Sequence, residues 1–292
     1  MNLQHKKKIL ILAIIMSFVV VFAYFVTISL SDMLFKQQIE REIKRLYSAS
    51  EAISNKTFSP EQIKDLPEPV KRYFTHSLEE GQHYISYVKL KHTGEFRQDE
   101  NQKWMPIEGH EYFTTEIPGF IWIGKISLLP LVWITGIDMY LEGRGAFQIK
   151  IMSIFTISDA PRGKELDQSE LMRWLAESPL FPTALLPSNY LHWEPVDSDS
   201  AKAMINYSGT KVEALFHFNK KGEIIQMNAD RYRVVHNSFV KEKWLGHYSN
   251  YAPAENMVVP WNIEVSWNSE IGNFTYAKFK INDIKYDDPV KY

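Results

Sequence analysis

Hydrophobic and polar positions divide the chain into stretches with different periodicities. No side chain from Ile9 to Leu30 is charged, and about 20 apolar residues are enough to span the hydrocarbon core of a bilayer. From His83 onward, short runs of aromatic and β-branched residues are separated by Gly, Pro or Asn, a pattern that predicts successive strands. Between these parts, from Asp32 to Ala52, apolar residues recur at the spacing of an amphipathic helix: Phe35, Ile39, Ile43 and Leu46.

The apolar run near the N-terminus is interpreted as an uncleaved signal anchor. A cleaved signal peptide is the alternative, but the run exceeds the usual ~7–15-residue apolar region and no clear small-x-small cleavage site follows it. A buried soluble helix would normally show a polar face. Lys6, Lys7 and Lys8 precede the run and favour retention of that end in the cytoplasm. We therefore expect a cytoplasmic tail (1–8), one transmembrane span (9–31) in the cytoplasmic membrane, and a body on the extracytoplasmic side.

Two short helices are predicted before the first strand. Ser59 is a suitable cap, Pro60 suits the first helical position, and Gln62 suits the third. A second helix is predicted from Pro69 to Phe74, with Gly81 as its stop. The extracytoplasmic part is thus expected to consist of a helical stalk or linker (32–65) and one α+β domain (66–292).

The spacing of the predicted strands favours an antiparallel sheet. Short polar turns such as Asn219–Gly222 separate them, whereas parallel strands need a crossover helix between them. Two runs, 120–126 (FIWIGKI) and 147–155 (FQIKIMSIF), are apolar on both faces. Strands of this kind are covered on both sides, or they line an apolar cavity.

One helix interrupts the strands in the segment from Arg162 to Pro187. Asp167 is its expected N-terminal cap, and Glu170, three residues later, would complete a capping box. Pro179 and Pro182 are expected to end the helix and to force an extended exit.

Composition excludes several classes of function. The chain has no cysteine, which rules out disulfides, thiolate nucleophiles, cysteine-ligated metals and a lipid-modified cysteine, and which fits a bacterial extracytoplasmic protein. The net charge is −2, so a nucleic-acid partner, which usually requires a basic surface, is not expected. The nine histidines lack metal-ligand spacing, and no nucleophile elbow, Walker loop or dinucleotide fingerprint occurs. No metal or cofactor is predicted.

Three charged residues of the central helix share one face: Glu170, Arg173 and Glu177. Such a group suits an acid–base or anion-binding site, in which apolar surroundings would raise the pKa of Glu177. Ion pairs at this spacing are also common on helix surfaces, where each contributes only about 0.2–0.5 kcal/mol. The surface ion pair is the preferred interpretation.

Aromatic residues make up 14% of the chain. An ordinary aromatic core is the preferred explanation for them. The alternative is an apolar pocket with a few polar groups, suited to acyl chains or another lipophilic ligand. Residues around the central helix are the candidates for lining such a pocket: Arg162, Arg173, Trp174, Glu177 and Trp193.

Several segments resemble an uncharacterised bacterial family, a domain of unknown function. They include LPEPVKRYF, GEFR, PGFIWIGKISL, YLEGRGAFQIKI, the central helix block and YSNYAPAENMVVPWNIEVSW, and together they extend from Leu66 to Tyr286. The resemblance brings no catalytic residues. The order of strands, helix and further strands is also similar to lipoprotein-carrier half-barrels, which implies a curved antiparallel sheet around an apolar cavity, with helices as a lid.

These observations predict a membrane-anchored α+β protein whose body is a large curved antiparallel half-barrel with helices packed across it. The leading functional hypothesis is the binding or handling of a lipophilic molecule at the membrane, without catalysis. One alternative is an envelope hydrolase or transferase that uses Glu177 or Glu170 with Arg173. Another is a scaffold that binds a protein partner through a sheet edge or through the 32–52 helix.

Overall fold

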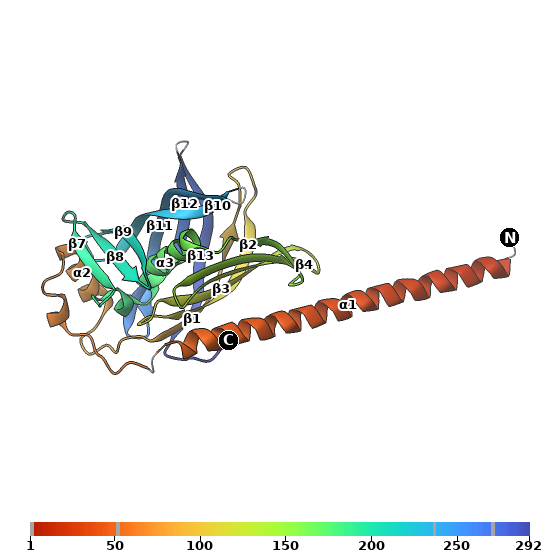
Figure 1. The fold of residues 1–292 in the computed structure, drawn as a ribbon, viewed down its shortest axis with the longest axis horizontal. Helices are drawn as coiled ribbons and strands as arrows, with labels where there is room; N and C mark the ends of the chain where they lie inside the picture. The colour runs from red at the N-terminus through yellow and green to blue at the C-terminus, as the bar shows by residue number, and fades with distance from the viewer. Residues whose placement is uncertain (1–2, 51–52, 236–237, 270–271) are drawn as a thin grey trace.

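The structure is a computed structural model that describes residues 3–50, 53–235, 238–269 and 272–292. Its first element, helix α1 (Leu3–Ser48), is long and apolar enough to cross a membrane. The N-terminal part of α1 extends away from the body (Figure 1), and its apolar side chains are exposed, unlike those of a buried soluble helix. A 3-10 helix, η1 (Pro60–Ile63), and helix α2 (Glu68–Ser77) follow where the sequence predicts them. Helix α2 ends at Ser77 with Leu78 as its C-cap, so the expected stop at Gly81 is wrong.

Thirteen strands form one sheet in the order β6-β5-β4-β3-β2-β1-β13-β12-β11-β10-β9-β8-β7. Every neighbouring pair is antiparallel, as the short turns predict. The strands are β1 (Tyr87–Phe96), β2 (Met105–Thr114), β3 (Gly119–Leu129), β4 (Val132–Leu141), β5 (Arg144–Ile151), β6 (Phe155–Asp159), β7 (Leu191–Pro195), β8 (Ser200–Tyr207), β9 (Thr210–Phe218), β10 (Ile224–Val235), β11 (Ser238–Ala254), β12 (Met257–Ser269) and β13 (Gly272–Tyr286).

The sheet is a half-barrel made of two meanders. One meander consists of strands β1–β6 and the other of strands β7–β13, and within each, consecutive strands of the chain are neighbours in the sheet. The pairing of β1 with β13 joins the two meanders. Strands β6 and β7 are the two ends of this order, so the sheet curves without closing (Figure 1). The segment that connects them carries helix α3 (Lys164–Glu177) and the 3-10 helices η2 (Ser178–Leu180) and η3 (Pro182–Leu185).

Helix α3 lies in the concave face of the sheet (Figure 1) and contributes to the main core. Trp174 of α3 is fully buried and packs near Phe181, with 5.9 Å between ring centroids. Helix α3 ends at Glu177, two residues before Pro179, so the expected helix break is confirmed. The expected extended exit is wrong, because two buried 3-10 helices, η2 and η3, follow the break. Helix α2 adds Tyr73 and Phe74 to the same core.

The C-terminal part of α1 covers the convex face of the same sheet. A second apolar cluster joins Ile43 and Leu46 to Tyr112, Ile121 and Ile137 of strands β2–β4. The predicted amphipathic helix is therefore confirmed as far as Ser48, while residues 51–52 lie outside the described residues. The run at 120–126 has two apolar faces because α1 covers one face of β3 and the α3 side covers the other. The run at 147–155 is not covered in this way, since Phe155 is 64% exposed.

The predicted capping box of the central helix is wrong. Helix α3 begins at Lys164 with Gly163 as its N-cap, and Asp167 and Glu170 are buried inside the helix. Asp167 instead accepts a hydrogen bond from the Gly145 amide at 2.8 Å. Glu170 pairs with Arg231 of β10 at 3.2 Å. Both carboxylates connect the helix to the sheet. They therefore do not form the local cap that the sequence spacing suggests.

Candidate ligand cavity and buried ion network

A cavity of about 410 Å³ opens on the concave side of the half-barrel. One face of α3 forms its floor, through Leu166, Ser169, Glu170, Arg173 and Glu177. Strands from both meanders form its walls, and aromatic side chains dominate them; among these are Phe96, Trp122, Trp244, Trp267, Tyr276 and Phe279. The cavity thus combines an apolar wall with a charged floor, a combination typical of small-molecule sites.

A row of glycines makes room for the Trp122 ring in this wall. Gly109, Gly124 and Gly136 are cross-strand neighbours on β2, β3 and β4. A Cβ atom on Gly124 would lie 2.2 Å from the Trp122 ring, and one on Gly109 would lie 2.3 Å from Nε2 of His92. Larger residues would therefore displace both rings. The indole Nε1–H of Trp122 donates a hydrogen bond to His92 Nε2 at 2.8 Å, which fixes the ring against the sheet.

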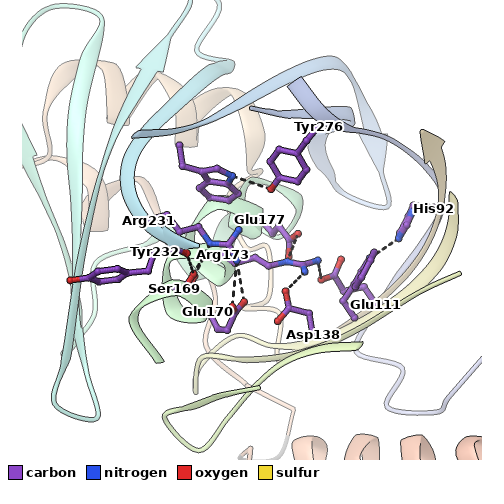
Figure 2. A network of polar contacts seen from close by, with 12 residues as sticks. His92, Glu111, Asp138, Ser169, Glu170, Arg173, Glu177, Arg231, Tyr232 and Tyr276 are labelled. Carbon is purple, nitrogen blue, oxygen red and sulfur yellow. Dashed lines mark hydrogen bonds and ion pairs between the residues drawn. The ribbon is translucent and has the colours of Figure 1, made fainter. Parts of the chain in front are cut away.

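Arg173 is the centre of the charged floor. Its side chain is only 11% exposed and pairs with three carboxylates. Nη2 lies 3.0 Å from Glu111, Nη1 lies 2.6 Å from Asp138, and Nε lies 3.1 Å from Glu177. The guanidinium also lies 5.0 Å from the centroid of the Trp122 ring, close enough for a cation–π contact. Figure 2 shows these carboxylates converging on Arg173 from β2, β4 and α3.

Arg231 of β10 forms the second cationic centre. Its Nη2 lies 3.2 Å from Glu170, and its Nε donates to the backbone oxygen of Ser169 at 3.1 Å. The guanidinium lies 4.5 Å from the centroid of the Trp244 ring, and Trp244 Nε1 donates to the Tyr276 hydroxyl at 3.1 Å. The two arginines thus attach α3 to both meanders (Figure 2).

Two carboxyl groups of the network favour their protonated form. Burial raises the pKa of Glu111, and the charge of Glu177 raises it further. Burial likewise raises the pKa of Glu170, with Asp138 as the next cause. Four carboxyl groups (Glu111, Asp138, Glu170 and Glu177) face two guanidinium groups, and the raised pKa values of Glu111 and Glu170 favour retention of a proton on each.

The geometry provides acceptors for those two protons. Oε2 of Glu177 and Oδ1 of Asp138 are buried and have no other hydrogen-bond partner among the described residues. A proton on Glu111 would place a donor beside Glu177, and a proton on Glu170 would place one beside Asp138. A buried charge is tolerated when it is paired and hydrogen-bonded, and this arrangement meets that condition for each acidic group.

The same surroundings shift the pKa values of the neighbouring basic groups. Burial alone would lower the pKa of Arg173, but Glu177, Glu111 and the other carboxylates raise it well above its usual value. Burial lowers the pKa of His92 to about 3, and the positive charge of Arg173 adds to this effect. His92 is therefore a neutral hydrogen-bond acceptor for Trp122 over the whole physiological pH range.

The residues that the sequence suggests as ligand-binding occupy different places. Arg173 and Glu177 lie together on the cavity floor, and their pair is not the surface pair that the sequence favours. Trp174 is in the core, where Nε1 donates to the Thr114 oxygen at 2.9 Å. Trp193 is also buried and donates to the Leu185 oxygen at 2.9 Å. Arg162 is exposed and donates to the Gly145 oxygen at 2.9 Å.

Sequence reasoning missed Glu111, Asp138 and Arg231, which complete the ion network around α3. Each is a single charged residue at an inward-facing position of a strand, in line with buried residues two positions away. Glu111 lies two positions before the buried Phe113, and Asp138 lies two positions before the buried Tyr140. A charge at a core position of a strand requires a partner, and that signal was present in the sequence. Among the described residues, no group of three or more His, Cys, Asp or Glu side chains is arranged to hold a metal ion.

Fold and cavity together define a class of protein: a single-sheet antiparallel half-barrel, with a helix across its concave face and an apolar helix at its N-terminus. More particularly, the chain belongs to a family of unknown function, DUF6920, whose model matches residues 64–286. No curated protein matches the chain.

Two solved structures are similar to this chain in fold. A LolA superfamily protein from Nitrosomonas europaea has a TM-score of 0.38 and 8% identity, over 74% of this chain and 91% of that chain. A putative outer membrane lipoprotein-sorting protein domain from Vibrio parahaemolyticus has a TM-score of 0.35 and 7% identity, over 70% of this chain and 87% of that chain. The resemblance to a family of unknown function that the sequence predicts is confirmed.

Proposed function

We propose that this protein binds a lipophilic molecule in the concave cavity and handles it at the membrane without catalysis. The observation that carries the proposal is the cavity of about 410 Å³, which is walled by aromatic side chains from both meanders. Aromatic walls offer a large apolar contact area, and pockets of roughly 300–1,000 Å³ are of the size that holds small ligands.

The charged floor gives the proposed ligand a defined orientation. Arg173 and Arg231 lie between carboxylates that already pair with them, so the floor supplies hydrogen-bonding groups and no unpaired positive charge. A ligand with an apolar body and a neutral or zwitterionic polar end fits this arrangement. A strongly charged end group would have to displace an existing ion pair and would bind less well.

The N-terminal helix is proposed to keep the cavity near its ligand. As a signal anchor in the cytoplasmic membrane, α1 would hold the body on the extracytoplasmic side, within reach of lipids. This orientation predicts that a single cysteine at Lys64, whose side chain is 57% exposed, reacts with a membrane-impermeant maleimide in intact spheroplasts. A cysteine at Lys7 should react only after the cells are opened. The opposite pattern would place the body in the cytoplasm.

Native mass spectrometry of the full chain, extracted in a mild detergent, tests the proposed binding. We expect a discrete additional mass that organic solvent removes and that lipid analysis identifies. The matched variants are Ile149→Glu and Ile225→Glu, because Ile149 lines the cavity, whereas Ile225 is 43% exposed on β10 and lies outside it. A glutamate at position 149 should abolish the additional mass, and one at position 225 should leave it in place.

Two results would contradict ligand binding. One is a clean protein mass in the wild type, together with no binding of a fluorescent fatty acid. The other is equal loss of the additional mass in both glutamate variants, which would trace the loss to stability. Thermal unfolding of each variant separates these explanations.

Acid–base chemistry at the cavity floor is a second candidate function. The proximity of Glu111 and Glu177, with the pKa of Glu111 raised by burial and by the Glu177 charge, is the observation that favours it, since paired carboxyl groups that share a proton occur in acid–base sites. Under this alternative, Glu177→Gln abolishes a cellular phenotype and leaves thermal stability nearly unchanged. Parallel loss of folding would assign Glu177 a structural role.

A further inference from the structure

Two hairpin tips of the first meander, β3–β4 and β5–β6, lie at the end of the sheet toward which α1 leaves the body. Antiparallel pairing places the β3–β4 turn and the β5–β6 turn at the same end, because β4 pairs with both β3 and β5. The β4–β5 turn, which contains Glu142, lies at the opposite end. Arg45 of α1 contacts Glu142 at 2.6 Å, so α1 crosses the convex face from that turn toward the β3–β4 tip (Figure 1).

These two hairpin tips expose large apolar side chains to an unusual degree. The exposed fractions are 68% for Leu129, 54% for Leu131, 64% for Phe155 and 57% for Ile157. Contiguous exposed apolar groups of this kind mark an interaction site rather than a solvated surface. We call this group, with Leu128, the apolar lip.

The apolar lip touches the proposed transmembrane span directly. The hydroxyl of Tyr24 donates a hydrogen bond to the backbone oxygen of Leu131 at 3.4 Å. Tyr24 lies within the uncharged run that ends at Leu30. At 1.5 Å per residue, its position is roughly 9 Å inside the end of that run. A helix that crosses the bilayer with this run would therefore carry the lip below the lipid headgroups.

The side chains behind the lip are those expected at a headgroup boundary. Trp133 follows the β3–β4 turn, and Lys125 Nζ lies 5.2 Å from its ring centroid. Lys150 of β5 lies 5.8 Å from the ring centroid of Phe35 on α1. Tryptophan and lysine gather at membrane interfaces, where tryptophan orients its amphipathic ring and lysine meets lipid phosphates.

We propose that the apolar lip inserts into the outer leaflet beside α1, so that its occupant is the acyl-chain region of the phospholipid bilayer. The half-barrel is then held by two membrane contacts, the span and the lip, and cannot rotate freely about α1. This inference rests on the proposed anchoring of α1, and it holds whether or not the cavity binds a ligand.

Site-directed spin labelling of the full chain tests the proposal, and the absence of native cysteine allows single labels without background. The chain is reconstituted into vesicles of phosphatidylethanolamine and phosphatidylglycerol. Labels are placed by Leu129→Cys in the lip, by Val20→Cys in the span, and by Val196→Cys. Val196 is 51% exposed and lies after β7, at the end of the sheet opposite the lip. Collision rates with oxygen and with a water-soluble nickel complex report the depth of each label.

We expect Leu129→Cys to behave as Val20→Cys does, with oxygen collisions exceeding nickel collisions, and Val196→Cys to show the reverse. Phe155→Cys serves as a second lip label if Leu129→Cys lowers the yield. A lip label that matches Val196→Cys overturns the insertion while leaving the anchor intact. A lip label shielded from both reagents overturns it in favour of a protein contact. A Val20→Cys label in water overturns anchor and insertion together.

Discussion

The two faces of strands β2–β4 are held to their helices by different kinds of interaction. The convex face meets α1 through apolar side chains such as Ile43, Ile121 and Ile137. The concave face meets α3 through a core that also contains the Arg173 ion network. Successive residues of one strand therefore serve opposite purposes: Tyr112 packs against the α1 side, and its neighbour Glu111 binds an arginine.

This difference shows how one sheet supports both an attachment and a cavity. Apolar packing on the convex side is non-directional and tolerates small adjustments of the helix. A buried ion network is directional, and an unpaired member is costly, so it fixes α3 at one position above the sheet. A cavity floor needs that fixed position, whereas a packed helix does not.

The largest effect is expected from removing the centre of the network. Arg173→Met leaves Glu111, Asp138 and Glu177 without their cation, and breaking a buried ion pair in this way costs about 3–5 kcal/mol. Urea unfolding followed by tryptophan fluorescence measures the loss. Arg45→Ala is the matched control, because Arg45 contacts Glu142 at 2.6 Å, the distance of the Arg173–Asp138 pair, but is 54% exposed. The control should change stability by less than ~1 kcal/mol, and similar losses in both variants would contradict the contrast.

A slightly smaller effect is expected on the convex face. Ile43 is 3% exposed, and Ile43→Ala should destabilise the body by about 2–4 kcal/mol through lost burial and a residual cavity. Leu34→Ala, at a position of the same helix that is 60% exposed, should be nearly neutral. Equal unfolding midpoints for the two variants would show that α1 contributes little to the stability of the sheet.

The effect of His92 on stability should appear only in acid. Its folded pKa is about 3, below the value of about 6.5 in an unfolded chain. Folding therefore releases the proton, so this contribution is present above about pH 6.5 and is lost as the pH falls toward 3. His92→Gln keeps an acceptor for Trp122 and removes the titration, so its stability should fall less steeply in that window. Parallel pH profiles of unfolding midpoints would contradict the assignment.

The opposite pH dependence is expected from Glu111. Its pKa is raised in the folded protein above about 4.3 in the unfolded chain, so folding favours the bound proton. That stability is complete below about pH 4.3 and is lost as the pH rises through the folded pKa. Glu111→Gln, always neutral, should become more stable relative to the wild type as the pH increases. A constant difference between the two profiles would show that Glu111 is ionised in the fold.

Much of the fold was predictable because each strand carries its own pattern. Short turns between alternating runs required antiparallel pairing, and the double-sided run at 120–126 is covered on both faces. The run at 147–155 is not, because Phe155 at its end is 64% exposed. The pairing of β1 with β13 was not predictable, because nothing local in either strand specifies a partner so distant in sequence. The capping box was mispredicted for a related reason: Asp167 and Glu170 satisfy the local rule but bind partners on the sheet.

Only part of the candidate site could be predicted from the sequence. Helical spacing places Arg173 and Glu177 together, since four residues make about one turn. Their partners Glu111, Asp138 and Arg231 come from three strands, and only the curvature of the sheet brings them to α3. Trp174 and Trp193 were predicted to line the pocket but lie in the core. The sequence could not separate these cases, because a tryptophan in a core and one in a pocket have the same sequence signal.

Under the proposed extracytoplasmic orientation, the pairing of β1 with β13 has a consequence for export of the chain. Strand β1 ends at Phe96 and its partner begins at Gly272, so nearly the whole body must leave the translocation channel before this edge is covered. Until then, β1 presents unpaired backbone groups of the kind that promote aggregation. Formation of such non-local contacts is slow compared with local helices and hairpins. With that orientation, we expect export of the body to depend on an envelope chaperone that shields the first meander until the last strand arrives.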